Sequence, residues 1–299
     1  MNQMRHDSVV HGVAANGALR GIGVRSTLTV DEARRRHDLW ATAAAALGRA
    51  LSATAMFGAM LKGDERVAVQ IICQGPLESI YADSDSRGHV RGYARNPHVD
   101  FELSAAGKLD VARAIGEGTL YVTRDLGLKE PYTSSVPLIS GELGQDFAYY
   151  LVKSEQTPSV VSLGVLVAPD FSVQAAGGFI IQALPGAEPN LLEQVEAHVK
   201  TLSPVSSIVD AGADAKDILQ TVLGPWQATV LAERPLAFHC DCSHERFERA
   251  LITLGAEEVQ DMIDQVGRAE LVCNFCNERY LFNSEQLQDI LATIKNSAQ

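Results

Sequence analysis

The sequence has few basic side chains, and they form no long run. Its longest basic run is residues 34–36, and 37 acidic against 25 basic residues give a formal net charge of -12. Because binding to phosphate backbones depends on Lys and Arg clusters, this balance argues against a nucleic-acid partner. Nucleotide motifs are also missing: there is no P-loop, and Gly21-Ile22-Gly23 lacks the third glycine of a dinucleotide-binding loop. We therefore expect neither nucleic acid nor nucleotide as a partner.

Targeting and membrane signals are lacking as well. Residues 1–11 contain no apolar run and no small-residue cleavage pattern, so no secretory signal is predicted and the cytoplasm is the expected compartment. Residues 39–61 contain a single charge, Arg49, but nine of these residues are alanine, which contributes little to membrane insertion. A helix that runs through a protein core is predicted there instead of a membrane span.

Cysteine is scarce, but four of the five cysteines gather near the C-terminus. They form a C-x-C pair, Cys240 and Cys242, and a C-x-x-C pair, Cys273 and Cys276. Four thiolates from two such pairs can close a tetrahedral shell around Zn²⁺. The sulfurs of a C-x-C pair also lie close enough to bond to each other when the metal leaves. The same four residues therefore predict either a zinc site or two short disulfide loops, and a candidate switch.

Catalytic motifs are weak or absent. His244-Glu245 begins an H-E-x-x-H pattern, but the second histidine is missing. The P-C-x-x-C of zinc deaminases is absent because Val272 precedes Cys273. Four cysteine ligands would also leave zinc no open position for an activated water. We therefore expect that the protein is not an enzyme.

The fifth cysteine, Cys73, ends a predicted strand over residues 67–73, in which alternate positions share one apolar face. It is interpreted as a buried small hydrophobe and not as a fifth ligand. Further strands are predicted at residues 79–82, 89–94, 119–123, 160–167 and 179–184, and a helix at residues 141–153. We expect an α+β fold, in which residues 1–184 form a mixed α/β core of short strands with one long buried helix.

Composition changes at residues 185–189, which carry two prolines and a glycine. Beyond them, one amphipathic helix is predicted at residues 191–202 and another at residues 217–223. Their apolar stripes need a surface to cover them, most simply that of the core. Residues 185–235 are predicted to be a helical linker. Residues 236–299 are predicted to be a small C-terminal α+β zinc-binding domain, which is too small to rely on its own core. The stripe of the first helix consists of Leu192, Val195, Val199 and Leu202.

Several segments together match a known family pattern, in the same order along the chain. They are Gln74-Gly75-Pro76-Leu77, Ser154-Glu155-Gln156-Thr157-Pro158, Ala175-Ala176-Gly177-Gly178, Phe238-His239-Cys240-Asp241-Cys242-Ser243 and Cys273-Asn274-Phe275-Cys276-Asn277. On these segments the chain resembles the heat shock protein 33 family, the redox-regulated holdase chaperones of the bacterial cytoplasm.

The resemblance implies a chaperone core, a linker folded over it and a C-terminal zinc domain that acts as a redox switch. Reduced protein would bind one Zn²⁺ per chain and be inactive. Oxidation would expel the zinc and form the disulfides Cys240–Cys242 and Cys273–Cys276. The linker would then unfold, a homodimer would form, and unfolding client proteins would be held without ATP during oxidative and heat stress. Apolar surface of the linker would contribute to client binding. The alternative is a zinc-ribbon adaptor whose zinc is purely structural.

Overall fold

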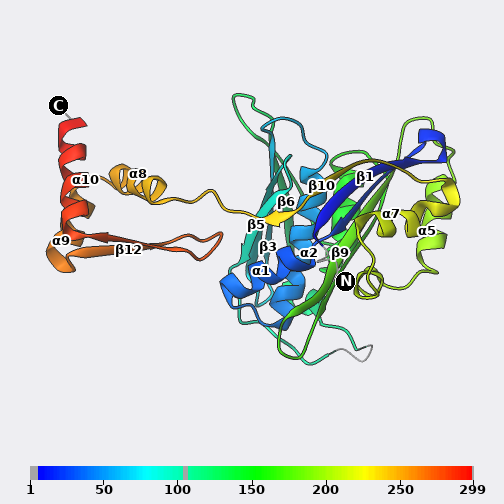
Figure 1. Cartoon of the computed structure of the whole chain (residues 1–299), viewed down its shortest axis with the longest axis horizontal. Helices are drawn as coiled ribbons and strands as arrows, with labels where there is room; N and C mark the ends of the chain where they lie inside the picture. The colour runs from blue at the N-terminus through cyan, green and yellow to red at the C-terminus, as the bar shows by residue number, and fades with distance from the viewer. Residues whose placement is uncertain (1–5, 104–106, 298–299) are drawn as a thin grey trace. The chain divides into compact units, whose positions relative to one another are not determined.

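The computed structural model describes residues 6–103 and 107–297, and it divides into two compact units. The first unit is Met1–His239 and the second is Cys240–Gln299 (Figure 1). Each unit has its own hydrophobic core and is described by itself.

Two sheets form the frame of the first unit. The five-stranded sheet has the order β10-β1-β2-β9-β8 and is antiparallel throughout. Its strands are β1 (Ser8–Ala14), β2 (Leu19–Arg25), β8 (Ser159–Val167), β9 (Val173–Ala183) and β10 (Thr229–Pro235). The six-stranded sheet has the order β11-β5-β4-β3-β6-β7, and only its β11–β5 pair is parallel. Its strands are β3 (Arg66–Cys73), β4 (Ser79–Asp85), β5 (His89–Ala94), β6 (Gly118–Asp125), β7 (Tyr132–Pro137) and β11 (Ala237–Phe238).

Helix α2 (Ala41–Gly58) packs against strands of both sheets (Figure 1). Every residue of it except Arg49 is buried, as expected for an alanine-rich helix whose small side chains admit close neighbours. Its buried hydroxyls are satisfied, since Ser52 and Thr54 donate to the carbonyls of Gly48 and Ala50. No helix in the described part of the chain is long and apolar enough to cross a membrane. The prediction of a core helix is confirmed.

The remaining helices of the core are short. They are α1 (Thr27–His37), α3 (Val111–Ile115) and α4 (Gly144–Lys153), with a 3-10 turn η1 at Ala15–Gly17. The predicted helix at residues 141–153 begins later than expected, because Gly141 and Leu143 both have positive φ angles and so lie outside the right-handed helical region. Its inner face carries Phe147, Tyr150 and Leu151, which are buried.

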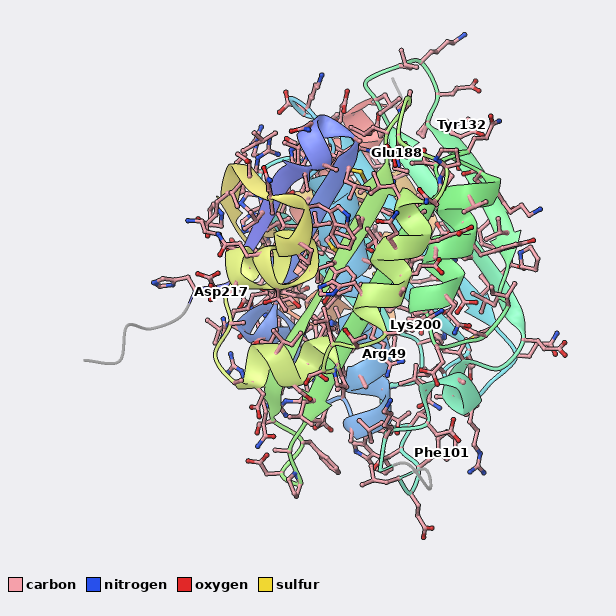
Figure 2. The ribbon with its side chains drawn as sticks, turned by 90° about the vertical axis from the view of Figure 1, so that its right-hand side faces the viewer. Arg49, Phe101, Tyr132, Glu188, Lys200 and Asp217 are labelled. Atoms are coloured by element: carbon pink, nitrogen blue, oxygen red, sulfur yellow. The ribbon has the colours of Figure 1, made fainter. Side chains whose placement is uncertain are left out.

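Three linker helices cover the five-stranded sheet. They are α5 (Leu191–Val199), α6 (Val205–Asp210) and α7 (Ala215–Leu223), which is followed by a 3-10 turn η2 (Gly224–Trp226). Figure 2 views this side of the unit, with Glu188 in the loop before α5, Lys200 at the end of α5 and Asp217 in α7. Of the predicted stripe, Val195 is fully buried, whereas Leu192, Val199 and Leu202 are partly buried against the same cluster. The stripe is therefore covered by the core, as the sequence predicts.

Glycines in the sheet allow α7 to lie close to it. A Cβ added to Gly23 would lie 2.8 Å from the carbonyl oxygen of Ala215, and one added to Gly21 would lie 2.5 Å from Leu219 Cδ1. Gly12 of β1 is similarly confined by Leu219. The Gly21-Ile22-Gly23 segment thus lies inside β2, where it makes room for a helix.

A single segment adds an edge strand to each of the two sheets. Its first part, β10, pairs with β1, and its second part, β11, pairs with β5. Between them, the amide of Leu236 donates to the carbonyl oxygen of Asp7 at 3.0 Å. Both strands of this segment lie in the first compact unit, and the second unit begins at Cys240.

The second unit packs three helices on a two-stranded antiparallel sheet. Its elements are α8 (His244–Leu254), α9 (Ala256–Gln265), β12 (Arg268–Val272), β13 (Arg279–Asn283) and α10 (Ser284–Ser297). Leu251, Val259, Phe282, Leu287 and Ile290 form its small core. The α+β fold class expected from the sequence is confirmed.

Candidate metal centre

The four C-terminal cysteines come together in the second unit. Cys240 Sγ lies 3.7 Å from Cys273 Sγ, and Cys242 Sγ lies 3.3 Å from Cys276 Sγ. All four sulfurs lie within 4.8 Å of one another. With zinc–sulfur bonds of about 2.3 Å, the edge of a regular tetrahedron of sulfurs is about 3.8 Å. The observed spacing brackets this value, so the four residues fit a tetrahedral metal ion.

The C-x-C pair is fixed by the helix that follows it. Ser243, directly after Cys242, accepts a hydrogen bond through Oγ from the amide of Arg246 at 3.2 Å. This contact caps α8 at its first turn. Ser243 is thus the N-cap of α8, and the start of this helix holds Cys242 in place.

The C-x-x-C pair lies in the turn between β12 and β13. The amide of Cys273 donates to the carbonyl of Glu278 at 2.9 Å, and the amide of Asn277 donates to the carbonyl of Cys273 at 2.7 Å. Asn277 has a φ of 59°, in the left-handed region that asparagine tolerates better than most residues. The resulting tight turn brings Cys276 back beside Cys273.

The surroundings of the thiols disfavour their ionisation. Burial raises the pKa of Cys273, and the nearby sulfur of Cys240 raises it further. Burial likewise raises the pKa of Cys276, which also contacts Cys242 and Cys273. Several thiolates this close together repel one another unless a cation lies between them. A divalent ion with an affinity for soft sulfur ligands is the partner that this set of donors suits.

Tyr280 is an additional residue of the centre. Its hydroxyl donates to Cys242 Sγ at 3.1 Å, and this hydrogen bond is the main reason why the pKa of Tyr280 is raised. Its ring packs on Phe247 with centroids 4.7 Å apart. The spacing of the cysteines does not predict this contact. The only signal in the sequence is an aromatic hydroxyl in the strand just after the second pair.

The histidines beside the first cysteine pair make other contacts. His244 lies against Phe282 with ring centroids 4.1 Å apart, and its Nε2 lies 3.4 Å from the carbonyl of Leu281. His239 belongs to the first unit, where its ring packs at a tilt against that of His89, with centroids 4.3 Å apart. Neither histidine is part of the cysteine cluster.

Cys73 is also separate from the cluster. It ends β3 on the buried face of that strand, 9 % exposed, as the alternating pattern predicts. Burial raises the pKa of its thiol, so the reactive thiolate is disfavoured there.

Comparisons with known proteins agree along almost the whole chain. The family model "Hsp33 protein" matches residues 7–283. A 33 kDa chaperonin of Geobacillus kaustophilus is 52% identical over 285 residues, which is 95% of this chain and 97% of that protein. The 33 kDa chaperonin of Bacillus subtilis is 49% identical over 285 residues, covering 95% and 98% of the two chains. The crystal structure of a 33 kDa chaperonin from Thermotoga maritima superposes with a TM-score of 0.91 at 39% identity, covering 98% of this chain and 100% of that one.

Proposed function

The chain belongs to the Hsp33 family, and on that premise we propose that it is a redox-regulated holdase chaperone. It binds unfolding client proteins in the cytoplasm and prevents their aggregation during oxidative and heat stress. The names of its relatives support the chaperone role. The observation that carries the regulation is the cluster of four thiols in a unit with a small core of its own.

In the resting state, one Zn²⁺ per chain is held by Cys240, Cys242, Cys273 and Cys276. The metal supplies positive charge that stabilises the thiolates, and the Tyr280 hydroxyl stabilises the charge on Cys242. Four sulfur ligands leave no open position for a reacting water, so we propose no catalytic step. No nucleotide, nucleic acid or membrane is needed.

Oxidation converts this centre into two disulfides. Cys240 pairs with Cys242, and Cys273 pairs with Cys276. For each disulfide, two thiolates give two electrons to one peroxide molecule, which takes up two protons and leaves as two waters, and the zinc ion is released. Structural zinc contributes on the order of 10 kcal/mol to the folding of such small units. The second unit therefore unfolds when it loses the ion.

Unfolding then extends to the linker. We assign residues 1–184 to the chaperone core, residues 185–235 to the linker and residues 236–299 to the redox switch. Undocking of α5 bares its own stripe, Leu192, Val195, Val199 and Leu202, together with the sheet surface beneath it. This apolar surface binds clients, and it also favours a homodimer of the activated chain.

The test compares reduced protein with protein treated with peroxide and mild heat. Aggregation of a thermally unfolding client is followed by light scattering, and zinc content is measured on the same samples. We expect only the treated protein to suppress aggregation, with loss of its zinc. Retention of zinc, without any gain of client binding, would instead favour an adaptor with a structural zinc site.

A further inference from the structure

The outer edge of β5 is covered by a very short strand that follows β10 in the chain. Ala237 and Phe238, which form β11, lie parallel to His89 and Val90. The amide of Ala237 donates to the carbonyl of Gly88, and the amide of His239 donates to the carbonyl of Val90, both at 3.0 Å. Backbone hydrogen bonds therefore hold β11 on the edge of β5.

The side chains of β11 itself are at most partly buried. Ala237 is exposed, and Phe238 is half-buried. The Phe238 ring packs against the main core cluster, with the Arg36 guanidinium 5.5 Å from its centroid. Two residues beyond Phe238, the chain enters the cysteine cluster at Cys240. A cover this short, attached directly to the redox centre, is removed when that centre unfolds.

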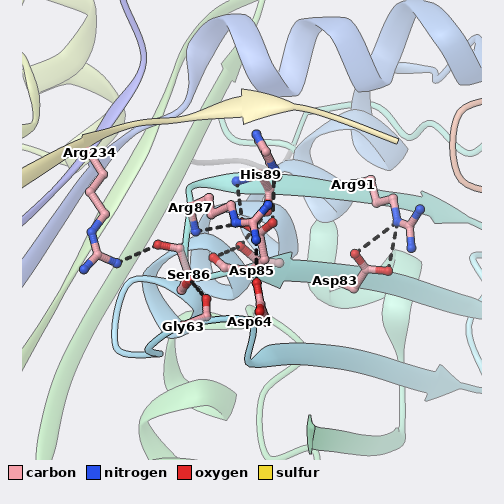
Figure 3. Close-up of polar contacts among 10 residues, drawn as sticks. Gly63, Asp64, Asp83, Asp85, Ser86, Arg87, His89, Arg91 and Arg234 are labelled. Atoms are coloured by element: carbon pink, nitrogen blue, oxygen red, sulfur yellow. Dashed lines mark hydrogen bonds and ion pairs between the residues drawn. The ribbon is translucent and has the colours of Figure 1, made fainter. Parts of the chain in front are cut away.

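The edge beneath the cover is held independently of it. β5 pairs with β4 on its other side, and Arg91 bonds to Asp83 across that pair at 3.0 Å. At the turn between the strands, Asp85 accepts hydrogen bonds from the amides of Arg87 and His89 (Figure 3). β5 thus keeps its place and its conformation when β11 leaves, and its outward carbonyls lose their partners.

We propose that the outer edge of β5 is a binding site for an extended polypeptide segment, which it takes as a parallel strand in place of β11. The inference rests on the proposed function, and the occupant is an extended segment of an unfolding client. Backbone hydrogen bonds recognise any extended chain, and the place of Phe238 receives one large apolar side chain of the segment. The strand of this chain that already lies there shows the register and direction of the occupant.

The first test uses the native occupant as the probe. A labelled peptide with the sequence of residues 234–239, Arg-Pro-Leu-Ala-Phe-His, is titrated into the full chain and followed by fluorescence anisotropy. We expect it to bind peroxide-activated protein but not reduced protein, and to compete with client. Methylation of the Ala237 nitrogen removes a donor to β5 and should weaken binding about tenfold. The Phe238 amide points away from β5, because successive amides of a strand alternate in direction, so its methylation is the matched control and should have little effect.

The second test opens the edge without oxidation. Proline at position 237 has no amide hydrogen, so Ala237→Pro detaches β11, and little packing is lost because Ala237 is exposed. The reduced, zinc-loaded variant should bind the peptide as activated wild type does. Absence of binding to this variant, or equal binding of the peptide methylated at Ala237, overturns the edge site.

The two tests separate the edge site from the proposed function. If peroxide fails to produce client binding while reduced Ala237→Pro binds the peptide, the redox function is wrong and the edge site stands. If peroxide activates the chain but the peptide does not compete with client, the function stands and the edge site is wrong.

Discussion

Replacement of Gly23 by alanine tests whether close docking of α7 keeps the chain inactive. Gly23 lies in β2, opposite Val10 of β1 and Phe179 of β9. A Cβ at this position would lie 2.8 Å from the carbonyl oxygen of Ala215. Ordinary contacts begin near 3.4 Å, so the start of α7 must move outward by roughly 0.6 Å, taking the van der Waals limit of close packing. The carbonyl oxygen of Ala215 belongs to the backbone, so turning a side chain cannot relieve this close contact.

The expected magnitude comes from overpacking alone. Overpacking of a closely packed contact costs about 1–3 kcal/mol. Gly23 stays in the folded sheet when α7 undocks, so the effect of alanine on the unfolded chain does not enter this equilibrium. With overpacking taken as about 2 kcal/mol, docking of α7 is weakened by that amount, which raises the undocked population about thirtyfold.

The assay combines hydrogen exchange with client binding, both on reduced protein. We expect faster exchange in α7 and partial suppression of client aggregation by Gly23→Ala, with unchanged zinc content. Gly224→Ala is the matched control, because no heavy atom lies within 4 Å of the added Cβ and the φ of Gly224 is -51°. A folded Gly23→Ala protein with the exchange rates of wild type and no client binding would refute the docking argument.

Three further predictions concern the thiols and one carboxylate. Cys273→Ser should lose zinc in metal analysis, whereas Cys73→Ala should keep both zinc and peroxide activation. Loss of either property in Cys73→Ala would assign a role to Cys73. Tyr280→Phe removes the hydrogen bond to Cys242 and should raise zinc loss to a competing chelator about fivefold; an unchanged rate would contradict this. Burial acts to raise the pKa of Asp85, but the amides of its turn outweigh it and lower the pKa. Ionised Asp85 therefore stabilises the fold at pH values above its ordinary pKa of 3.8. This contribution is lost as the pH falls through the lower pKa of Asp85 in the folded protein. Asp85→Asn should therefore reduce resistance to urea at neutral pH, and this effect should disappear in acid. If the variant and wild type differ by the same amount at every pH, the charge of Asp85 is not the cause.

The sequence predicts the elements that are specified locally. The alternation over residues 67–73 identifies the buried face of β3, and the spacing of the cysteines identifies the residues that cluster. The helical spacing over residues 191–202 identifies the covered face of α5, although the helix ends at Val199. In each case the pattern is contained in one short stretch of chain.

Features that depend on distant partners are not predicted. The strand β11 pairs with β5, which lies far back in the sequence, and no local pattern identifies that partner. The paired glycines of β2 resemble a broken binding loop until α7 is seen above them. The contact between Tyr280 and Cys242 is not predicted, because these two residues are also far apart in the sequence.

The pairing of β1 with β10 has a consequence for synthesis of the protein. β1 leaves the ribosome well before its partner β10, which is made only after the whole core and most of the linker. The first unit therefore folds with many contacts of long sequence separation, which makes folding slow. Until the segment that carries β10 and β11 has emerged, both sheets of the nascent chain have an open edge, the feature that leads other folding intermediates to aggregate. While it is being made, this chain itself needs the protection that we propose it gives to others.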